Sequence, residues 1–242
     1  PFIFQEKKII NNKKNIKLLL LRAIFGGVTM ILLFCSYSMI PLSQAMAVSF
    51  STPLFIYLGG IFFFKEKTNK FKNSMLILGF LLTLIIIRPD LEIKLGIIFA
   101  IIAAITHAIA GLLVKEISKS ESVIILMFSM VFLMSPITFI PSVYIWTTPQ
   151  NFYIYVLLIS IAIIASLGNY CWTKALSLSN LTNLMPFDFS KLIFTTILGF
   201  IFFNENLDII TLICGTGLII CTNLTAIKIK KNENSKTILS NN

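Results

Sequence analysis

Long runs of apolar residues, separated by short polar stretches, make up most of the chain. A helix that crosses a bilayer needs about 20 mostly apolar residues, and the chain offers eight such candidates. They cover 18–39, 43–64, 73–89, 95–114, 122–146, 152–175, 183–203 and 208–228, of which 73–89 is short. The pattern predicts an all-α polytopic membrane protein with short loops and no separate soluble domain.

Composition agrees with this prediction, because 57% of the residues are hydrophobic and only 12% are charged. That charged share is about half of what a soluble domain carries. A soluble enzyme or a soluble nucleic-acid-binding domain is therefore excluded.

The positive charges are sorted between alternate loops. The net charge is +10, and of the 20 Lys and Arg residues only Arg88 and Lys94 fall in one set of loops. The other set and the two tails hold Lys7, Lys8, Lys13, Lys14, Lys17, Lys65, Lys67, Lys70, Lys72, Lys115, Lys119, Lys174, Lys228, Lys230, Lys231 and Lys236. Lysine-rich loops stay in the cytoplasm, so we expect both termini there, in an inner membrane. Attraction to anionic lipid accounts for the net charge, and no nucleic-acid partner is needed.

An internal repeat relates two of these apolar runs. Ser38–Glu66 aligns without gaps on Ser177–Glu205, at an offset of 139 residues, with ten of 29 positions identical. The second run lies five helices after the first. Because each span reverses the direction of the chain, an odd number of spans places the second copy upside down in the membrane. Inverted repeats are a common architecture of secondary transporters, whose substrate site lies between the copies near the bilayer midplane.

The repeat predicts how the chain is organised. A basic loop (1–17) precedes the last three helices of a first five-helix copy (18–89), a complete second copy (95–228) and a basic tail (229–242). We therefore expect a ten-helix protein with two helices encoded before Pro1. A chain that truly began at Pro1 would be an inactive remnant of a transporter, and the coding sequence upstream distinguishes these alternatives.

Two segments carry a family resemblance. They run from Ser51-Thr52-Pro53-Leu54-Phe55 through Gly60 to Glu66 and from Pro186-Phe187-Asp188-Phe189-Ser190-Lys191-Leu192 through Gly199 to Glu205. With Arg22, Ala23 and Gly26 and the inverted repeat, they resemble the EamA family of the drug/metabolite transporter superfamily, including its S-adenosylmethionine uptake branch. The resemblance implies transport of amino acids, nucleotide-derived metabolites or drugs. One departure is Lys191, where many relatives carry Arg, because Lys lacks the two-pronged geometry of a guanidinium.

The strongest candidate site is in the run 183–203. Asp188 and Lys191 are three residues apart and share a helix face, and Lys191 lies about 12 Å into a hydrocarbon core of about 30 Å. Charges at that depth usually face a cavity or a partner. We expect a polar pocket, with Ser190 beside it, in which Lys191 meets an anionic group and Asp188 a cationic group or a proton. The alternative is an ion pair that only neutralises itself between helices.

Five further polar or aromatic residues are weaker candidates. His107, the only histidine, is either a proton site or a structural histidine bonded to a neighbouring helix. Arg22 either snorkels to the cytoplasmic headgroups or lines the inner gate. Asn169, Tyr170 and Trp172 share a helix and either line the pocket or join helices.

Two glutamates that end their apolar runs have a structural explanation. A carboxylate is disfavoured at a helix C-terminus, so Glu66 and Glu205 are expected to pair with a lysine or to cap the next helix. Pro53 is expected to kink its helix.

The remaining motifs exclude several kinds of chemistry. No phosphate-binding loop is present, so transport would be secondary, and no cofactor is expected. The four cysteines show no C-x-x-C spacing, so no metal site is indicated. A membrane-embedded enzyme is the third alternative, but His107 has no acidic neighbour in sequence. The expected partners are a small mixed-charge solute, such as an amino acid or S-adenosylmethionine, and membrane lipid.

Overall fold

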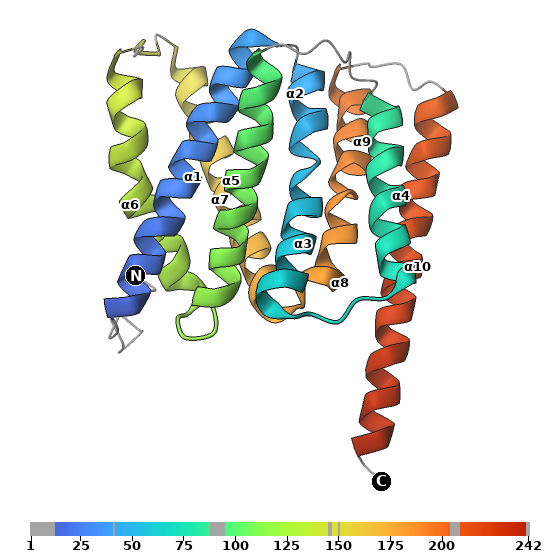
Figure 1. Ribbon diagram of the computed structural model, residues 1–242. Coiled ribbons are helices and arrows are strands. Elements are labelled where there is room, and N and C mark those ends of the chain that lie inside the picture. Colours follow the sequence, from blue (N-terminus) through green and yellow to red (C-terminus); the bar gives the residue numbers. More distant parts are fainter. Residues whose placement is uncertain are drawn as a thin grey trace.

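The computed structural model describes residues 13–40, 42–87, 95–144, 147–149, 151–203 and 209–240. Within these ranges the chain is helical and contains no strand, which confirms the all-α prediction (Figure 1). The helices are α1 (Lys13–Met39), α2 (Leu42–Ser49), α3 (Thr52–Phe64), α4 (Lys70–Ile87), α5 (Leu95–Ile117), α6 (Val123–Tyr144), α7 (Phe152–Leu178), α8 (Leu181–Asp188), α9 (Lys191–Phe203) and α10 (Ile209–Ser240).

Length and composition make several segments able to cross a membrane. Five described segments qualify outright: Asn15–Met39, Gln44–Phe64, Leu95–Ile117, Val123–Ile140 and Phe152–Leu178. Leu212–Lys228 is a shorter apolar helix. The chain is thus a polytopic membrane protein, while the count of eight spans stays a prediction.

The helix boundaries repeat at the offset found in the sequence. Adding 139 to the first and last residues of α1, α2 and α3 gives the first and last residues of α7, α8 and α9, and adding it to the first residue of α4 gives that of α10. The two halves therefore share one pattern of helices, and α5 and α6 lie between them in sequence.

The runs 43–64 and 183–203 are each predicted as one membrane-spanning helix, with a kink at Pro53 in the first, and the structure shows that both are interrupted. Each run is divided into two helices, at residues 50–51 and at residues 189–190. The two breaks are at equivalent positions of the repeat.

A serine closes a tight turn at the same place in both helix breaks. In the first copy the Ser51 amide and hydroxyl both donate to the Val48 carbonyl, at 2.9 and 2.6 Å. In the second copy the Ser190 amide and hydroxyl donate to the Phe187 carbonyl, at 3.0 and 2.7 Å. Bonds to the carbonyl three residues back tighten the backbone into a turn. Pro53, in the first turn of α3, has no N–H to continue the preceding helix.

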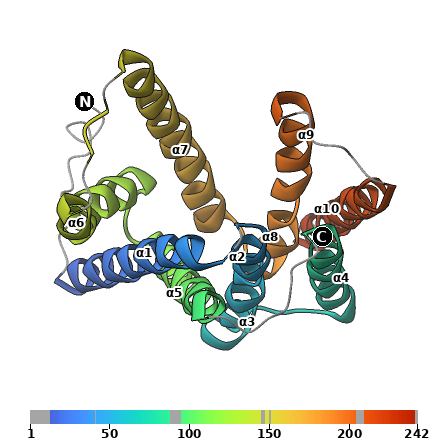
Figure 2. The ribbon, with the colours of Figure 1, turned by 90° about the horizontal axis from the view of Figure 1, so that it is seen from above.

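Helix packing is centred on α5 and on the two breaks. α1, α2 and α3 pack against α5, and α4 packs against α10. The equivalent residues Phe50 and Phe189 meet between the two breaks, both buried, with ring centroids 6.4 Å apart. α7 lies at the edge of the bundle (Figure 2), and its residues from Phe152 to Gly168 are all exposed.

Candidate functional site

A cavity of about 310 Å³ lies where the two helix breaks face each other. From the breaks it is lined by Ser49 and Thr52 of the first copy and by Asp188 and Lys191 of the second. The rest of the lining comes from α1, α5 and α7: Leu33, Tyr37, Ala103, Ala104, His107, Gly168, Asn169 and Trp172. The volume is at the lower end of the range for small-molecule sites.

Asp188 and Lys191 form an ion pair in this cavity. Lys191 Nζ lies 2.8 Å from Asp188 Oδ2, and the side chains are 49% and 13% exposed, respectively. Lys191 Nζ also lies 4.7 Å from the centroid of the Phe50 ring, a cation–π arrangement with the first copy. The pair therefore neutralises itself and also lines the cavity, and solute binding by the two charges stays a prediction.

Sequence reasoning missed the opposite wall of the cavity. Ser49 and Thr52 are the counterparts of Asp188 and Lys191 at the offset of 139, and all four residues line the same space. The repeat could have revealed them, because the offset of 139 residues maps the charged pair of the second copy onto these two positions of the first. Ser49 and Thr52 were overlooked because small uncharged side chains are common inside membrane helices.

A second cavity, of about 250 Å³, continues from the first. The two share Leu33, His107, Asn169 and Trp172 as lining residues. The second cavity is otherwise lined by Arg22, Gly26, Thr29, Met30, Ala110, Gly111, Val114, Met130, Met134 and Thr173. His107, Asn169 and Trp172, singled out from the sequence, therefore lie at the junction of the two cavities.

Arg22 lines the second cavity with its side chain turned into the bundle. It is 4% exposed, and its Nη1 donates to the Leu126 carbonyl of α6 at 2.6 Å. Its Nη2 lies 3.4 Å from Met130 Sδ, and the Asn169 amide reaches the same sulfur at 3.6 Å. The guanidinium thus faces α6 and the second cavity.

Two other predicted site residues lie outside both cavity linings. The Ser190 hydroxyl is bonded within its own turn to Phe187. Tyr170 is 37% exposed, with Lys174 Nζ 5.7 Å from its ring centroid. Neither contributes to the surface that a solute in the cavities would touch.

Glu66 closes one end of the bundle by joining the two copies. It follows α3, and its two carboxylate oxygens accept the amides of Leu181 and Thr182, at 2.8 and 2.7 Å. These are the first residues of α8, where unpaired amides favour a negative charge. Gly60 allows the approach, since a Cβ there would lie 3.1 Å from Leu181 Cβ. The capping role predicted for Glu66 is thus observed, on a helix of the other copy, whereas Glu205 lies outside the described residues.

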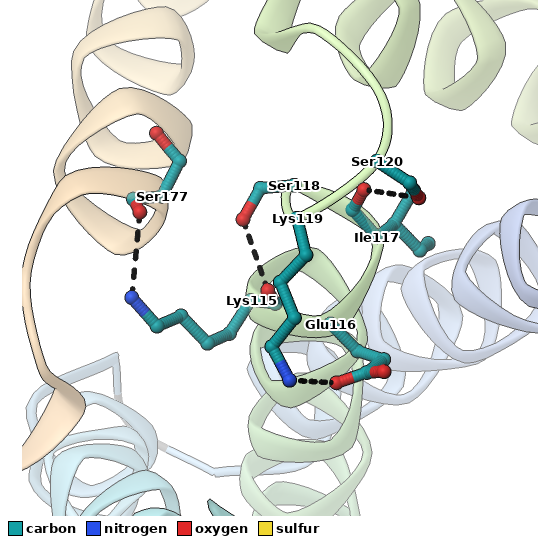
Figure 3. Close-up of polar contacts among 7 residues, drawn as sticks. All are labelled: Lys115, Glu116, Ile117, Ser118, Lys119, Ser120 and Ser177. Carbon is teal, nitrogen blue, oxygen red and sulfur yellow. Dashed lines mark hydrogen bonds and ion pairs between the residues drawn. The ribbon is translucent and has the colours of Figure 1, made fainter.

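Lys115, in the last turn of α5, also binds this junction, and Figure 3 shows its ammonium directed at Ser177 near the end of α7. Its Nζ donates to the carbonyls of Ser177 and Ser179, at 3.3 and 2.6 Å. A cation satisfies carbonyls left unpaired at the end of α7. The ammonium of Lys115 and the carboxylate of Glu66 therefore both bind the turn between α7 and α8.

The fold matches a known architecture. A solved crystal structure of a protein superposes with a TM-score of 0.78, covering 92% of this chain and 81% of that one, at 11% identity.

Relatives with assigned activities are also similar in sequence. An S-adenosylmethionine uptake transporter of Rickettsia bellii is 28% identical over 202 residues, covering 83% of this chain and 69% of the relative. A riboflavin transporter of Vibrio cholerae is 24% identical over 166 residues, covering 68% of this chain and 56% of the relative. The alignments thus span between about half and two thirds of these relatives.

The model of the EamA-like transporter family matches residues 1–88 and 94–226. These two ranges contain both helix breaks and the lining of both cavities. The resemblance seen in the sequence is confirmed, and the chain belongs to the EamA-like transporter family.

Proposed function

We propose that this protein is a secondary transporter that moves a small mixed-charge solute across the inner membrane. The observation that carries the proposal is the Asp188–Lys191 ion pair, which lines a cavity between two equivalent helix breaks. Discontinuous helices that meet near the midplane are where secondary transporters bind solutes. The relatives are named for S-adenosylmethionine and riboflavin, which supports a small organic solute.

The solute would bind by exchanging partners with the Asp188–Lys191 ion pair. A solute with an ammonium or sulfonium group replaces Lys191 as the partner of Asp188, and its anionic group pairs with the released Lys191. Both charges of the protein then stay compensated, which matters because an unpaired charge in a membrane interior is costly. Tyr37 and Trp172 offer aromatic surface to the apolar part of the solute, and His107 is a candidate proton carrier.

Alternating access would operate by movement of one copy against the other. The loops α3–α4, α5–α6 and α7–α8 lie at the same end of the bundle (Figure 1), and they contain Lys65, Lys67 and Lys119. By the positive-inside rule this end faces the cytoplasm. Glu66 binds α8 at this end, and this contact would have to break for the cavity to open towards the cytoplasm.

Uptake by the full-length protein in proteoliposomes tests the proposal. The panel contains labelled S-adenosylmethionine, amino acids and riboflavin. We expect transport of at least one mixed-charge solute, and Lys191→Ala and Asp188→Asn should each abolish it without loss of folded protein.

Lys174→Ala is the matched control. Lys174 is an exposed cation at the end of α7 that lines neither cavity, so this variant should transport like the wild type. Full activity of Lys191→Ala, or uptake of none of the panel by the wild type, would contradict the proposal.

A further inference from the structure

The two cavities together form an elongated space with charge at both ends. Along α1 the lining runs from Arg22 to Tyr37, a span of about 22 Å at 1.5 Å per residue. The Asp188–Lys191 pair lines only the first cavity and Arg22 only the second, while His107 and Trp172 belong to both. The charged groups are thus separated by a neutral middle section.

Arg22 differs from Lys191 in its partners. Lys191 is neutralised by Asp188 at 2.8 Å. Among the described residues Arg22 forms no ion pair, and its guanidinium contacts one backbone carbonyl and one thioether sulfur, neither of which carries charge. A guanidinium has five N–H donors, so the two contacts leave others for a ligand.

An uncompensated cation in an apolar surrounding attracts an anion. The side chain is 4% exposed, and among the residues that the structure describes no other charged side chain lines the second cavity. Burial of a charge without a counter-charge costs several kcal/mol per ion, and an anion that enters the cavity removes that cost. A planar guanidinium also suits the two oxygens of a carboxylate or phosphate.

We propose that Arg22 forms a second anion subsite, separate from the Asp188–Lys191 pair, for a carboxylate or phosphate group. The inference rests on the proposed function for its physiological meaning, because it assigns the transported solute a further acidic group far from its cationic one. A free inorganic anion has the same chemistry and is distinguished below.

Trp172 provides a probe of the subsite that does not depend on transport. The chain has two tryptophans, so Trp146→Phe leaves Trp172, which lines both cavities, as the only one. In detergent-solubilised full-length protein, its fluorescence is quenched by iodide (an anion), caesium (a cation) or acrylamide (neutral). We expect iodide to quench at least about threefold more efficiently than caesium, because a focused positive field concentrates anions. Acetate and inorganic phosphate should protect against iodide.

Matched variants assign the effect to Arg22. Arg22→Gln should remove the iodide excess and the protection, whereas Lys191→Gln should keep most of both, and acrylamide quenching should be unchanged in each. Arg22→Lys, which retains the charge, should keep a reduced excess. Loss of the excess in Lys191→Gln but not in Arg22→Gln would overturn the proposal.

The Trp146→Phe protein with Arg22 unchanged is decisive even where Arg22→Gln fails to fold. Equal quenching by iodide and caesium in Trp146→Phe would overturn the subsite. If no solute of the panel is transported but the iodide excess is present, the proposed function fails and the subsite stands.

Buffer exchange distinguishes the source of the anion. Uptake that persists when chloride and phosphate are omitted and sucrose maintains the osmolarity, and that acetate inhibits competitively, identifies the solute's own acidic group. Uptake that requires phosphate or chloride identifies a free anion at Arg22.

Discussion

The two helix breaks have the same helix boundaries but differ in the side chains that they present to the cavity, which are uncharged at the first break and charged at the second. Both place a serine at the turn, and both begin and end their helices at equivalent residues. At the positions that face the cavity, the first break carries Ser49 and Thr52 and the second carries Asp188 and Lys191. Duplication therefore explains the architecture, and divergence at two positions explains why only one wall of the cavity is charged.

One contact between the two copies joins a helix end to a carboxylate. α3 packs along α8, and Glu66 bonds to the first amides of α8. Glu205, the counterpart of Glu66 at the offset of 139, lies outside the described residues. The contact of Glu66 with α8 lies between the two copies of the repeat, where a transporter that alternates its access must open.

Replacing the charged residues of the second break by those of the first should have the largest effect on uptake. The double change Asp188→Ser and Lys191→Thr makes the second break like the first, and solute uptake should fall below detection because the cavity loses its charged contacts. Ser49→Ala with Thr52→Val should reduce uptake only several-fold, since each neutral hydrogen bond contributes about 1 kcal/mol. Initial uptake rates in proteoliposomes measure both.

A rescue variant sharpens this test. Ser49→Asp and Thr52→Lys, added to the inactive double variant, place the pair on the opposite wall of the same cavity. Partial recovery of uptake would show that the equivalent positions serve one solute. No recovery, in protein that is folded, would show that the cavity requires the charges on the second copy.

The contact of Glu66 with α8 predicts an intermediate effect. Glu66→Ala removes two charge-assisted hydrogen bonds at the start of α8, each contributing about 1.5–3 kcal/mol, and should lower the unfolding midpoint by about 5 °C or more. A cysteine introduced at Thr182, now buried, should react faster with a polar maleimide added on the cytoplasmic side.

Glu116→Ala is the matched control for this prediction. Glu116 forms a surface ion pair with Lys119 one turn away on the same segment, and exposed pairs contribute little. The midpoint and the Thr182→Cys labelling should hardly change. Equal effects of Glu66→Ala and Glu116→Ala would show that Glu66 does not hold the two copies together.

Much of this arrangement could be predicted from the sequence because the repeat preserves it. The offset of 139 residues relates the observed boundaries of α1, α2 and α3 to those of α7, α8 and α9. Asp188, Lys191, His107, Asn169 and Trp172 all line the first cavity, since polar residues within an apolar helix usually face a cavity.

Other features could not be predicted because they depend on contacts between distant helices. The breaks at Phe50 and Phe189 lie within apolar runs that read as continuous helix, and the serine hydroxyls that stabilise each turn leave no periodic signal. The direction of Arg22 depends on a backbone carbonyl of α6, at Leu126, and a sequence pattern does not reveal backbone acceptors. The partner of Glu66 is likewise 115 residues away.

The serines of the two breaks should give the smallest effect, and it separates a structural role from a binding role. Ser51→Ala and Ser190→Ala each remove one hydroxyl bond to a carbonyl three residues back. Each should lower the free energy of unfolding by about 1 kcal/mol, and uptake should change equally little in both. A much larger loss of uptake in Ser190→Ala than in Ser51→Ala, at equal stability, would restore Ser190 as a solute contact. Equal effects would leave both serines with the task of breaking the helix, so that Asp188 and Lys191, at the ends of the two helix segments, can face the cavity together.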